Sequence, residues 1–283
     1  MRVLVTGADG QLGYDVIKRL DENNIEYLAT DKDELDITNE AQTNNVITKY
    51  NPDVVVHCAA YTAVDKAEDE RELCYNTNVL GTRYVAAACK KIDAKMVYIS
   101  TDYVFDGEGD QPFEVTDQPN PINYYGKTKY EGELEVQKLL DKYFIIRISW
   151  VFGINGNNFV KTMLRLGKER GEISVVADQI GSPTYTYDLA GLIVDMIQTD
   201  KFGIYHVTNE GFCSWYEFAR EIFKQAGIKV KVNPIDSEHY PTKAKRPKNS
   251  RLSKRKLVQE GFSALTEWKR ALQQFINIIE REI

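Results

Sequence analysis

The sequence predicts an α/β fold, a Rossmann-like doubly wound parallel sheet with a smaller α/β part toward the C-terminus. Two observations predict it. In the first half of the 283-residue chain, short runs rich in valine and isoleucine alternate with longer amphipathic runs, which is the pattern of βαβ units. The first run leads directly into a glycine-rich turn, and Gly, Asp, Asn and Pro gather after later runs. Such turns lie at the carboxyl edge of the sheet, where ligands bind.

The expected elements follow the chain in order. Buried strands are expected at residues 3–6, 26–29, 54–57, 96–100 and 144–148. Helices are expected at residues 11–23, 40–50, 70–91 and 125–140, because amphipathic runs of that length are typical of helices that cover a sheet. No repeat or flexible linker separates the two halves. Segments returning from the sheet, mainly after Asn155, must therefore form the second part.

Composition excludes several classes of protein. Hydrophobic residues make up 43% of the chain and charged residues 28%, as in an ordinary globular protein. The net charge of −6 argues against a nucleic-acid partner, since binding to phosphate backbones depends on accumulated Lys and Arg. No apolar stretch is long enough to span a membrane, and the N-terminus does not resemble a signal peptide. We therefore expect a cytoplasmic protein with no membrane partner, whose four scattered cysteines are free thiols.

The run at residues 3–13 is a strand, a tight turn and a helix start, with glycines spaced as GxxGxxG. Gly7 permits the turn, Gly10 lets the backbone approach a pyrophosphate, and Gly13 leaves room for helix and strand to pack. This spacing resembles that of the short-chain dehydrogenase/reductase superfamily. The resemblance implies a nicotinamide dinucleotide as the cofactor.

An acidic residue at the end of the second expected strand bears on the choice of cofactor. Asp31 can accept a hydrogen bond from the ribose 2′-hydroxyl of NADH and repel a 2′-phosphate, whereas Lys32 beside it can attract that phosphate. The sequence therefore predicts NADPH or NADH and leaves the preference open. Residues 1–150 are expected to form the NAD(P)-binding Rossmann domain. Residues 151–283 are expected to form mainly the substrate-binding part, with some segments that return to the Rossmann domain.

Tyr125 and Lys129 lie four residues apart, so on a helix both side chains share one face. A nearby ammonium favours the phenolate and is expected to lower the tyrosine pKa toward the range useful for proton transfer. Tyr14 and Lys18 have the same spacing, but behind the glycine-rich turn a surface pair is the better interpretation. Position distinguishes the first pair, because it follows the loop from the fourth expected strand, where the hydroxyl of Thr101 can stabilise charge on a carbonyl oxygen.

Several segments carry a closer resemblance, and together they cover nearly the whole chain. They are AAYTAVDKAE at 59–68, STDYVFDG at 100–107, YYGKTKYEGE at 124–133, SWVFG at 149–153, GNNFVKTMLRL at 156–166, DQIGSPT at 178–184 and RPKNSRL at 246–252. These segments resemble the dTDP-4-dehydrorhamnose reductases. The resemblance implies hydride transfer from NAD(P)H to the C4 ketone of dTDP-4-dehydro-β-L-rhamnose, giving dTDP-L-rhamnose for cell-surface polysaccharide synthesis. It also implies that Tyr125 supplies the proton, that Lys129 holds the nicotinamide ribose and that Thr101 assists at the carbonyl.

The predicted site residues form three groups. The catalytic group is Tyr125, Lys129 and Thr101. The cofactor-binding group is Gly7, Gly10, Gln11, Leu12, Gly13, Asp31, Asp36, Ile37, Ala59, Ala60, Tyr61, Ser100, Tyr125 and Lys129. Of these, Asp36, Ile37, Ala59, Ala60 and Tyr61 are implied by the family resemblance alone. The substrate-binding group is Thr101, Asp102, Val104, Phe105, Trp150, Asn157, Asn158, Arg246 and Asn249. A tryptophan can stack on a ring, asparagines can bind sugar hydroxyls, and an arginine can grip a diphosphate. The basic stretch at 229–256 around Arg246 is either part of such an anion site or a solvated face.

The resemblance also implies, for some family members, a magnesium ion at a dimer interface, where this chain has Asp15. We expect no metal, because a single carboxylate in a helix is ordinarily solvated and no cluster has ligand spacing. Monomer and homodimer both stay open. So do two other functions. One is another nucleotide-sugar reductase or epimerase, or a dehydratase, although the segment at 101–103 lacks the Asp-Glu pair of dehydratases. The other is a non-catalytic regulatory subunit of a methionine adenosyltransferase, which the intact catalytic group disfavours.

Overall fold

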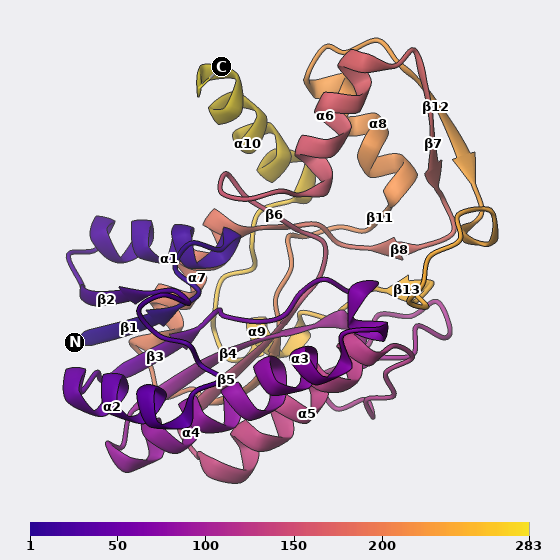
Figure 1. The fold of residues 1–283 in the computed structure, drawn as a ribbon. Coiled ribbons are helices and arrows are strands. Elements are labelled where there is room, and N and C mark those ends of the chain that lie inside the picture. Colours follow the sequence, from indigo (N-terminus) through magenta and orange to yellow (C-terminus); the bar gives the residue numbers. More distant parts are fainter. Residues whose placement is uncertain (283) are drawn as a thin grey trace.

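A six-stranded, fully parallel sheet organises the computed structural model, which describes residues 1–282 and the side chains of residues 1–279 (Figure 1). The strands lie in the order β10-β5-β4-β3-β1-β2. Their bounds are β1 Arg2–Thr6, β2 Glu26–Thr30, β3 Val54–His57, β4 Lys95–Thr101, β5 Tyr143–Ile148 and β10 Gly203–His206. The five strands expected from the sequence are thus confirmed to within one residue at each end. The order in which successive strands are added reverses between β1 and β3: β2 lies on one side of β1, whereas β3 and the later strands lie on the other. In such sheets a ligand-binding crevice lies outside the carboxyl ends of the strands at this point.

Helices cover both faces of the sheet (Figure 1). Helices α1 (Gln11–Glu22) and α7 (Thr186–Ile197) pack on one face, and α2 (Glu40–Tyr50), α4 (Thr82–Lys91) and α5 (Tyr124–Leu139) on the other. The alternation of β1 shows why, because Val3 and Val5 face α1 and α7 while Leu4 faces the other layer. Successive side chains of a strand point to opposite faces. Burial on both sides accounts for the continuous apolar runs in these strands.

The helix expected at residues 70–91 has an interruption that the sequence pattern did not show. It comprises α3 (Arg71–Tyr75), a π-helical segment (Asn76–Gly81) and α4, and a short 3₁₀ turn (Lys66–Glu68) precedes it. Within the π-helical segment, the side chain of Asn78 bonds to the backbone of Tyr61, accepting from its N–H at 2.8 Å and donating to its carbonyl at 3.1 Å. A wider helical turn at this point lets Asn78 hold the loop that follows β3.

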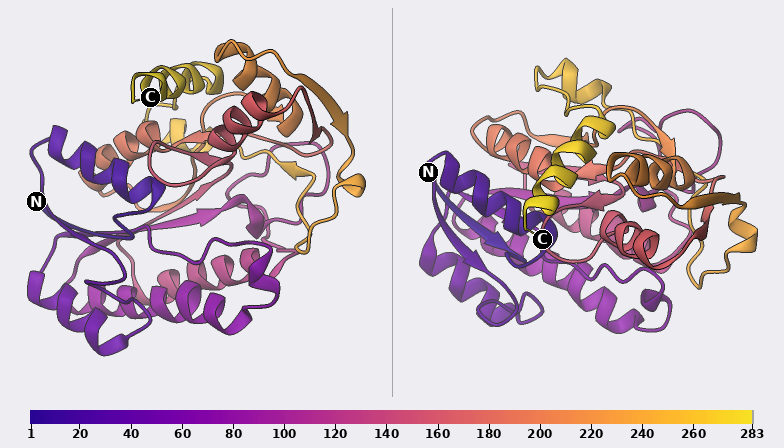
Figure 2. Two further views of the ribbon diagram at one scale, coloured as in Figure 1. Left: turned by 45° about the horizontal axis from the view of Figure 1, so that its top comes forward. Right: turned by 90° about the horizontal axis from the view of Figure 1, so that it is seen from above.

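Most of the remaining elements form a smaller part above the carboxyl edge of the sheet (Figure 2). Its helices are α6 (Phe159–Glu169), α8 (Trp215–Gln225) and α10 (Trp268–Glu282). The short strands are β6 (Val151–Phe152), β7 (Glu172–Val176), β8 (Ile180–Gly181), β9 (Thr184–Tyr185), β11 (Cys213–Ser214), β12 (Lys231–Ile235) and β13 (Asn249–Ser250). An apolar cluster rich in aromatic side chains, including Phe152, Phe218 and Phe275, binds α6, α8 and α10 together.

Three segments from the second half of the chain return to the large sheet. Strand β10 pairs in parallel with β5 at its edge, and α7 contributes Leu189 and Ile193 to the core against α1. Helix α9 (Arg255–Gln259) adds Leu257 to the same core. Within the described residues, no helix is both long and apolar enough to cross a membrane. All four cysteines, Cys58, Cys74, Cys89 and Cys213, are free thiols.

Candidate active site

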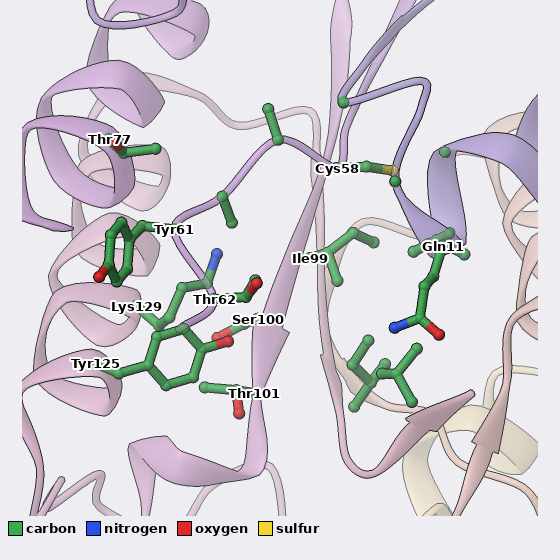
Figure 3. Close-up of a pocket in the computed structure, with 18 of the residues that line it drawn as sticks. Gln11, Cys58, Tyr61, Thr62, Thr77, Ile99, Ser100, Thr101, Tyr125 and Lys129 are labelled. Atoms are coloured by element: carbon green, nitrogen blue, oxygen red, sulfur yellow. The ribbon is translucent and has the colours of Figure 1, made fainter. Parts of the chain in front are cut away.

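A cavity of about 900 Å³ opens at the carboxyl edge of the large sheet. One wall is the glycine-rich turn after β1, and the opposite wall comes from the end of β4 and the first turns of α5 (Figure 3). Its far end is closed by Trp150 and Trp215 from the second half of the chain. All fourteen residues predicted to bind cofactor line this cavity, and so do Thr101, Asp102 and Trp150. The fold therefore gathers residues from widely separated segments into one site.

The glycine-rich turn is shaped by contacts that leave no room for side chains. Gly7 has φ of +66°, in the left-handed region, and a β-carbon there would lie 2.7 Å from the amide nitrogen of Ala59. At Gly13 a β-carbon would lie 2.1 Å from the Gly7 carbonyl oxygen. No side chain caps the start of α1 at Gly10, and no acidic residue occupies its first turn. Its first amides are therefore free to face an anion such as a pyrophosphate, so this cradle fits a dinucleotide.

The carboxylate of Asp31, at the end of β2, is tied to the backbone rather than free. It accepts from the amide of Asp9 at 2.9 Å and from that of Lys32 at 2.7 Å. Asp36 is held similarly by the amide and hydroxyl of Thr38 at 2.9 and 2.7 Å, and these hydrogen bonds lower its pKa. Lys32 is exposed at the rim of the cavity. This end of the pocket therefore offers two carboxylates held by hydrogen bonds and one exposed cation.

The three predicted catalytic side chains meet on the wall formed by β4 and α5 (Figure 3). Thr101 ends β4, and its hydroxyl donates to Asp102 at 3.0 Å while accepting from the amide of Tyr103 at 3.2 Å. Tyr125 lies in the first turn of α5, and Lys129 follows one turn later on the same face. The Lys129 ammonium sits 4.2 Å from the ring centre of Tyr98. A phenol, a hydroxyl and a cation thus border one reaction space.

The expected effect of Lys129 on the pKa of Tyr125 is wrong. Burial, and next the negative charge of Asp102, raise the pKa of Tyr125 above its ordinary value, and only a hydrogen bond from Thr101 opposes them to any notable degree. Burial also lowers the pKa of Lys129 to about 7, against the opposing charge of Glu133. The cation is therefore itself weakened by its desolvation. Tyr125 stays a protonated phenol at neutral pH, as a proton donor to a carbonyl oxygen must.

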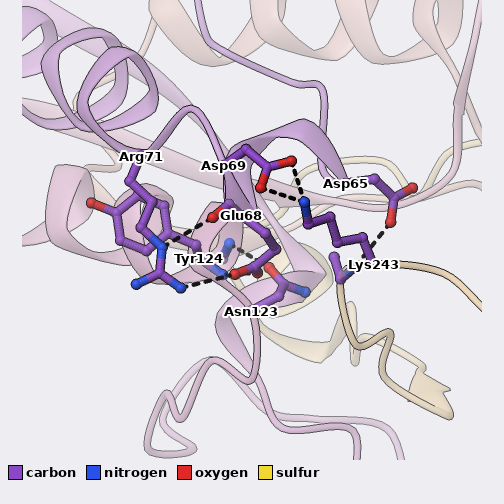
Figure 4. A network of polar contacts seen from close by, with 9 residues as sticks. Asp65, Glu68, Asp69, Arg71, Asn123, Tyr124 and Lys243 are labelled. Carbon is purple, nitrogen blue, oxygen red and sulfur yellow. Dashed lines mark hydrogen bonds and ion pairs between the residues drawn. The ribbon is translucent and has the colours of Figure 1, made fainter.

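Three hydrogen bonds fix the start of α5, which carries Tyr125 (Figure 4). Glu68 accepts from the amide of Tyr124 at 2.8 Å. Asn123 caps the helix by accepting from the amide of Gly126 at 2.8 Å, and its amide group donates to the carbonyl of Lys245 at 2.8 Å. The first turn of the helix is therefore fixed both to the loop after β3 and to the basic segment near residue 245.

At the far end of the cavity, two indoles stack face to face. The ring centres of Trp150 and Trp215 are 3.7 Å apart and their planes differ by 14°. Trp150 has φ of +49°, a conformation that is costly for a bulky residue and is typical of functional sites. Sequence reasoning found Trp150 but missed Trp215, because Trp215 begins α8 far along the chain with no motif around it. It also missed Thr62, Val64, Leu73, Thr77 and Ser149 in the lining.

Six residues predicted to bind substrate do not line the cavity. Val104 and Phe105 are buried in a small apolar cluster with Leu252. Asn249 is buried and donates to the carbonyl of Gln111 at 2.8 Å, so its amide is committed to joining two loops. Arg246 forms a bidentate pair with Asp65 at 3.1 and 2.6 Å. Its charge is therefore neutralised by protein in this structure rather than left free for a diphosphate.

The other two of these six residues are Asn157 and Asn158. Asn157 is exposed. Asn158 caps α6, and its amide donates to the Gln11 side chain at 3.1 Å. Nearby, Asn155 donates to the carbonyl of Asp9 at 2.6 Å. These two hydrogen bonds join the loop before α6 to the glycine-rich turn. The Asn158 side chain is therefore already occupied by helix capping and by its contact with Gln11.

Asp15, the one position that suggested a metal, is fully buried on α1 and accepts a hydrogen bond from Thr186 of α7. Burial raises the pKa of this carboxyl, while the hydrogen bond from Thr186 lowers it. Among the residues that the structure describes, no three His, Cys, Asp or Glu side chains gather as metal ligands would. Asp15 thus serves the contact between the two helices.

Comparisons with known proteins agree with this geometry. Residues 1–281 match the family model described as the RmlD substrate binding domain. A dTDP-4-dehydrorhamnose reductase of Aggregatibacter actinomycetemcomitans is 45% identical, over 96% of this chain and 97% of that protein. A dTDP-4-keto-6-deoxy-D-glucose reductase of Streptomyces niveus is 35% identical, over 99% and 98%. The crystal structure of dTDP-4-dehydrorhamnose reductase from Bacillus anthracis in complex with NADP superposes with a TM-score of 0.95 at 49% identity, covering 99% of both chains.

Proposed function

This chain belongs to the RmlD substrate-binding family, that of the dTDP-4-dehydrorhamnose reductases, and from that membership we propose that it reduces a sugar-nucleotide ketone with NAD(P)H. The substrate is dTDP-4-dehydro-β-L-rhamnose and the product is dTDP-L-rhamnose, a precursor for cell-surface polysaccharide. One observation carries the proposal. The protonated phenol of Tyr125 and the hydroxyl of Thr101 face the same cavity as the glycine-rich cradle. A carbonyl placed between these walls meets both a proton donor and a dinucleotide site.

The chain's own residues account for the proton half of the reaction. When bound, the reduced nicotinamide supplies a hydride to C4 of the ketone. Tyr125 donates its phenolic proton to the carbonyl oxygen and is then reprotonated from solvent. The Thr101 hydroxyl turns from Asp102 to that oxygen as negative charge develops on it. Lys129 holds the nicotinamide ribose and stabilises the transient phenolate, which its position one helical turn away allows.

The cofactor site accepts NADPH or NADH on chemical grounds. The free amides at the start of α1 and the closed packing of Gly7 and Gly13 fit the pyrophosphate. Asp31 already accepts two backbone amides, which reduces its repulsion of a 2′-phosphate, and the exposed Lys32 can pair with that phosphate. The related Bacillus anthracis enzyme was solved with NADP. NADPH is therefore the first cofactor to test.

The remaining assignments follow from this function. Residues 1–150 form the NAD(P)-binding Rossmann domain, and residues 151–283 form mainly the substrate-binding part, with segments such as α7 and β10 that return to pack on the Rossmann domain. The stacked indoles of Trp150 and Trp215 provide an apolar surface for a flat or apolar ring face. A cytoplasmic location suits an enzyme with four free cysteines, since thiols persist in reducing compartments.

The test is turnover with the purified protein. With NADPH and dTDP-4-dehydro-β-L-rhamnose, we expect loss of NADPH absorbance and a product that NMR identifies as dTDP-L-rhamnose. Absence of cofactor oxidation with any 4-keto sugar would refute the proposal and favour a non-catalytic role. Conversion without net cofactor oxidation would indicate an epimerase.

A second candidate substrate has one observation in its favour. The Streptomyces niveus relative acts, by its name, on dTDP-4-keto-6-deoxy-D-glucose. That sugar differs in ring stereochemistry, and its C4 carbonyl needs the same Tyr125 and Thr101. Assaying both sugars side by side distinguishes them, because the true substrate has the higher kcat/KM.

A further inference from the structure

A buried ion pair lies directly behind the active-site wall and has no part in the reaction as described. Glu133 on α5 and Arg147 on β5 have side-chain exposures of 0% and 2%. Two hydrogen bonds join them, from Arg147 Nε to Glu133 Oε1 at 2.9 Å and from Arg147 Nη2 to Oε2 at 2.7 Å. Desolvation makes such pairs poor sources of stability compared with apolar residues of similar volume. Its presence here therefore calls for a reason other than packing.

The pair reaches the cavity through two routes. The hydroxyl of Ser100, which lines the cavity at the end of β4, donates to Glu133 Oε1 at 2.6 Å. Glu133 also follows Lys129 by four residues in α5. Their side chains therefore lie on the same face of the helix, one turn apart. Among the described residues, the Lys129 ammonium has no ion-pair partner within 4.0 Å. Glu133 is thus an immobilised carboxylate next to an unpaired, buried ammonium.

We propose that Glu133 is a positioning residue for the reduction: clamped by Arg147 and Ser100, it supplies the fixed negative charge that keeps Lys129 an ammonium inside the buried site. This inference rests on the proposed function, because it assigns a task to the lysine of the catalytic group. It also explains the clamp. A carboxylate free to rotate would form a direct ion pair with Lys129 and pull the ammonium away from the cavity.

The charged and titratable groups around Lys129 support this assignment. Burial lowers the pKa of Lys129 to about 7, and Glu133 is the first group that opposes this fall, followed by the thiols Cys74 on α3 and Cys58 after β3. From β4, Tyr98 presents its ring and its hydroxyl, and burial keeps that hydroxyl protonated. From β3, His57 is neutral because burial lowers its pKa to about 3. Of the groups that act on the Lys129 ammonium, Glu133 is therefore the one that carries a full negative charge.

Several groups from neighbouring strands face Glu133. Besides Arg147 and Ser100, these are Tyr98 on β4 and Tyr143 on β5, both with pKa values raised in part by Glu133. His206 on β10 contacts Arg147 at 3.4 Å and is neutral, since burial lowers its pKa to about 3. Within the part of the chain whose side chains are described, Arg147 is thus the single cation paired with the carboxylate.

The chain offers a matched control on the same helix. Glu135, two residues further along α5, forms a comparable bidentate pair with Arg83 at 2.8 and 2.9 Å. That pair lies on the outer face, with side-chain exposures of 15% and 41%, and it does not line the cavity. Glu135→Gln therefore removes the same charge from the same helix without touching the site.

The first experiment measures the lysine directly, in the protein without cofactor. The ¹³Cε signal of Lys129 is assigned by its loss in Lys129→Met, and its pH titration is compared among variants. We expect Glu133→Gln to move the Lys129 midpoint about one to two pH units lower, because a neighbouring opposite charge shifts a pKa by about 1–3 units. Glu133→Asp, which keeps the charge, and Glu135→Gln should stay within about 0.3 unit of the wild type. An unchanged midpoint in Glu133→Gln would overturn the proposal.

Glu133→Gln leaves Arg147 as an unpaired buried cation, and such variants can fail to fold. Glu133→Gln/Arg147→Met removes both charges together. Because Glu133 and not Arg147 is among the causes of the Lys129 shift, the midpoint should still move lower in the double variant. An unmoved midpoint there would refute the role even if the single variant is insoluble.

The second experiment follows kcat against pH with NADPH and the 4-keto sugar. Activity that needs the ammonium falls as pH rises through the Lys129 pKa, so this alkaline limb should move to lower pH in Glu133→Gln and return in Glu133→Asp. A purely structural role predicts lower kcat at every pH with the limb unmoved, which would contradict the proposal. If the wild type shows no turnover with any sugar, the function fails, while the NMR titration still decides the charge relationship.

Discussion

The α-carbon of Gly126 lies so close to Tyr103 that a β-carbon there would stand 2.1 Å from the Tyr103 carbonyl oxygen. This contact joins the first turn of α5 to the segment that leaves β4. The rings of Tyr103 and Tyr125 also meet edge to face, with centres 6.0 Å apart. The distance between the phenol of Tyr125 and the hydroxyl of Thr101 is therefore set by backbone contact, which cannot relax as a flexible side chain can.

Gly126→Ala should push the start of α5 away from β4. Overpacking of this kind costs about 1–3 kcal/mol of stability, and a displacement near 1 Å at a reacting group lowers rates by up to about 100-fold. We expect kcat to fall about 10- to 100-fold with a smaller change in the cofactor Kd. Gly171→Ala, where a β-carbon meets nothing within 4 Å, is the control. Wild-type kcat in Gly126→Ala would show that the contact does not position Tyr125.

Tyr125→Phe removes the proposed proton donor without altering the ring. General acids contribute typically 10²-fold or more, so kcat should drop by at least about that factor while NADPH binding persists. Tyr14→Phe, at the other tyrosine with a lysine four residues on, is exposed and should leave kcat unchanged. Turnover of Tyr125→Phe within about twofold of the wild type would assign the proton to another group.

Gly13→Ala places a β-carbon 2.1 Å from the carbonyl oxygen of Gly7. The turn must open, at a cost of about 1–3 kcal/mol, which corresponds to roughly 10- to 100-fold weaker cofactor binding if the strain is borne at that site. Fluorescence titration with NADPH measures this directly. Equal affinity in variant and wild type would mean that the pyrophosphate lies elsewhere.

Trp215→Ala tests the far end of the cavity. Removing this indole leaves Trp150 without its stacking partner, and aromatic pairs contribute about 0.5–1.5 kcal/mol beyond burial. We expect KM for the nucleotide sugar to rise about 3- to 10-fold with kcat nearly constant, the pattern of lost uniform binding. Trp215→Phe, which keeps an aromatic face, should recover most of the loss. An unchanged KM would remove Trp215 from the substrate site.

Stability should fall in acid because of two buried histidines. Burial lowers the pKa of His57 and His206 from 6.5 to about 3, so between these values only the unfolded chain binds the protons. Their contribution is complete above pH 6.5 and is lost as pH falls toward 3, by about 1.4 kcal/mol per pH unit for each. Asp102, whose pKa burial raises to about 6, offsets part of this between pH 6 and 4.

The variant that checks this is His57→Asn, whose amide can replace the 2.7 Å contact of Nδ1 with Thr6. Its free energy of unfolding should depend less steeply on pH between 6 and 4. His239→Asn is a suitable comparison, because His239 is exposed on the surface. Parallel pH curves for wild type and His57→Asn would contradict the assignment of a neutral buried imidazole.

Most of the fold of the first half was predictable, because both faces of its sheet are covered. Strands such as β3 then read as unbroken apolar runs, and the glycine-rich turn marks where α1 begins. The π-helical segment was not predictable, since it depends on Asn78 reaching a loop seventeen residues earlier. In the second half five strands, β6, β8, β9, β11 and β13, are only two residues long, too short for any periodicity to show.

The site residues show the same difference between the two halves of the chain in what the sequence could predict. Residues that follow strands of the large sheet, such as Thr101 and Ala59, were correctly expected at the cavity, because the carboxyl ends of parallel strands share one edge. Trp215 was missed because only tertiary packing brings α8 there. Arg246 illustrates a different limit, since a sequence shows an available cation but not the Asp65 that neutralises it. The pKa of Tyr125 depends on burial, which a four-residue spacing cannot report.

The hydrogen bonds from Asn155 to the carbonyl of Asp9 and from Asn158 to the side chain of Gln11 join two distant parts of the chain. A displacement of α6 would therefore be transmitted to the glycine-rich turn. A chimera that takes residues 151–283 from a relative must keep a hydrogen-bond acceptor in the side chain at position 11, whereas the contact at position 9 uses a backbone carbonyl that any residue supplies. Exchanging sugar specificity between relatives therefore requires that the glycine-rich turn and the loop before α6 be exchanged together.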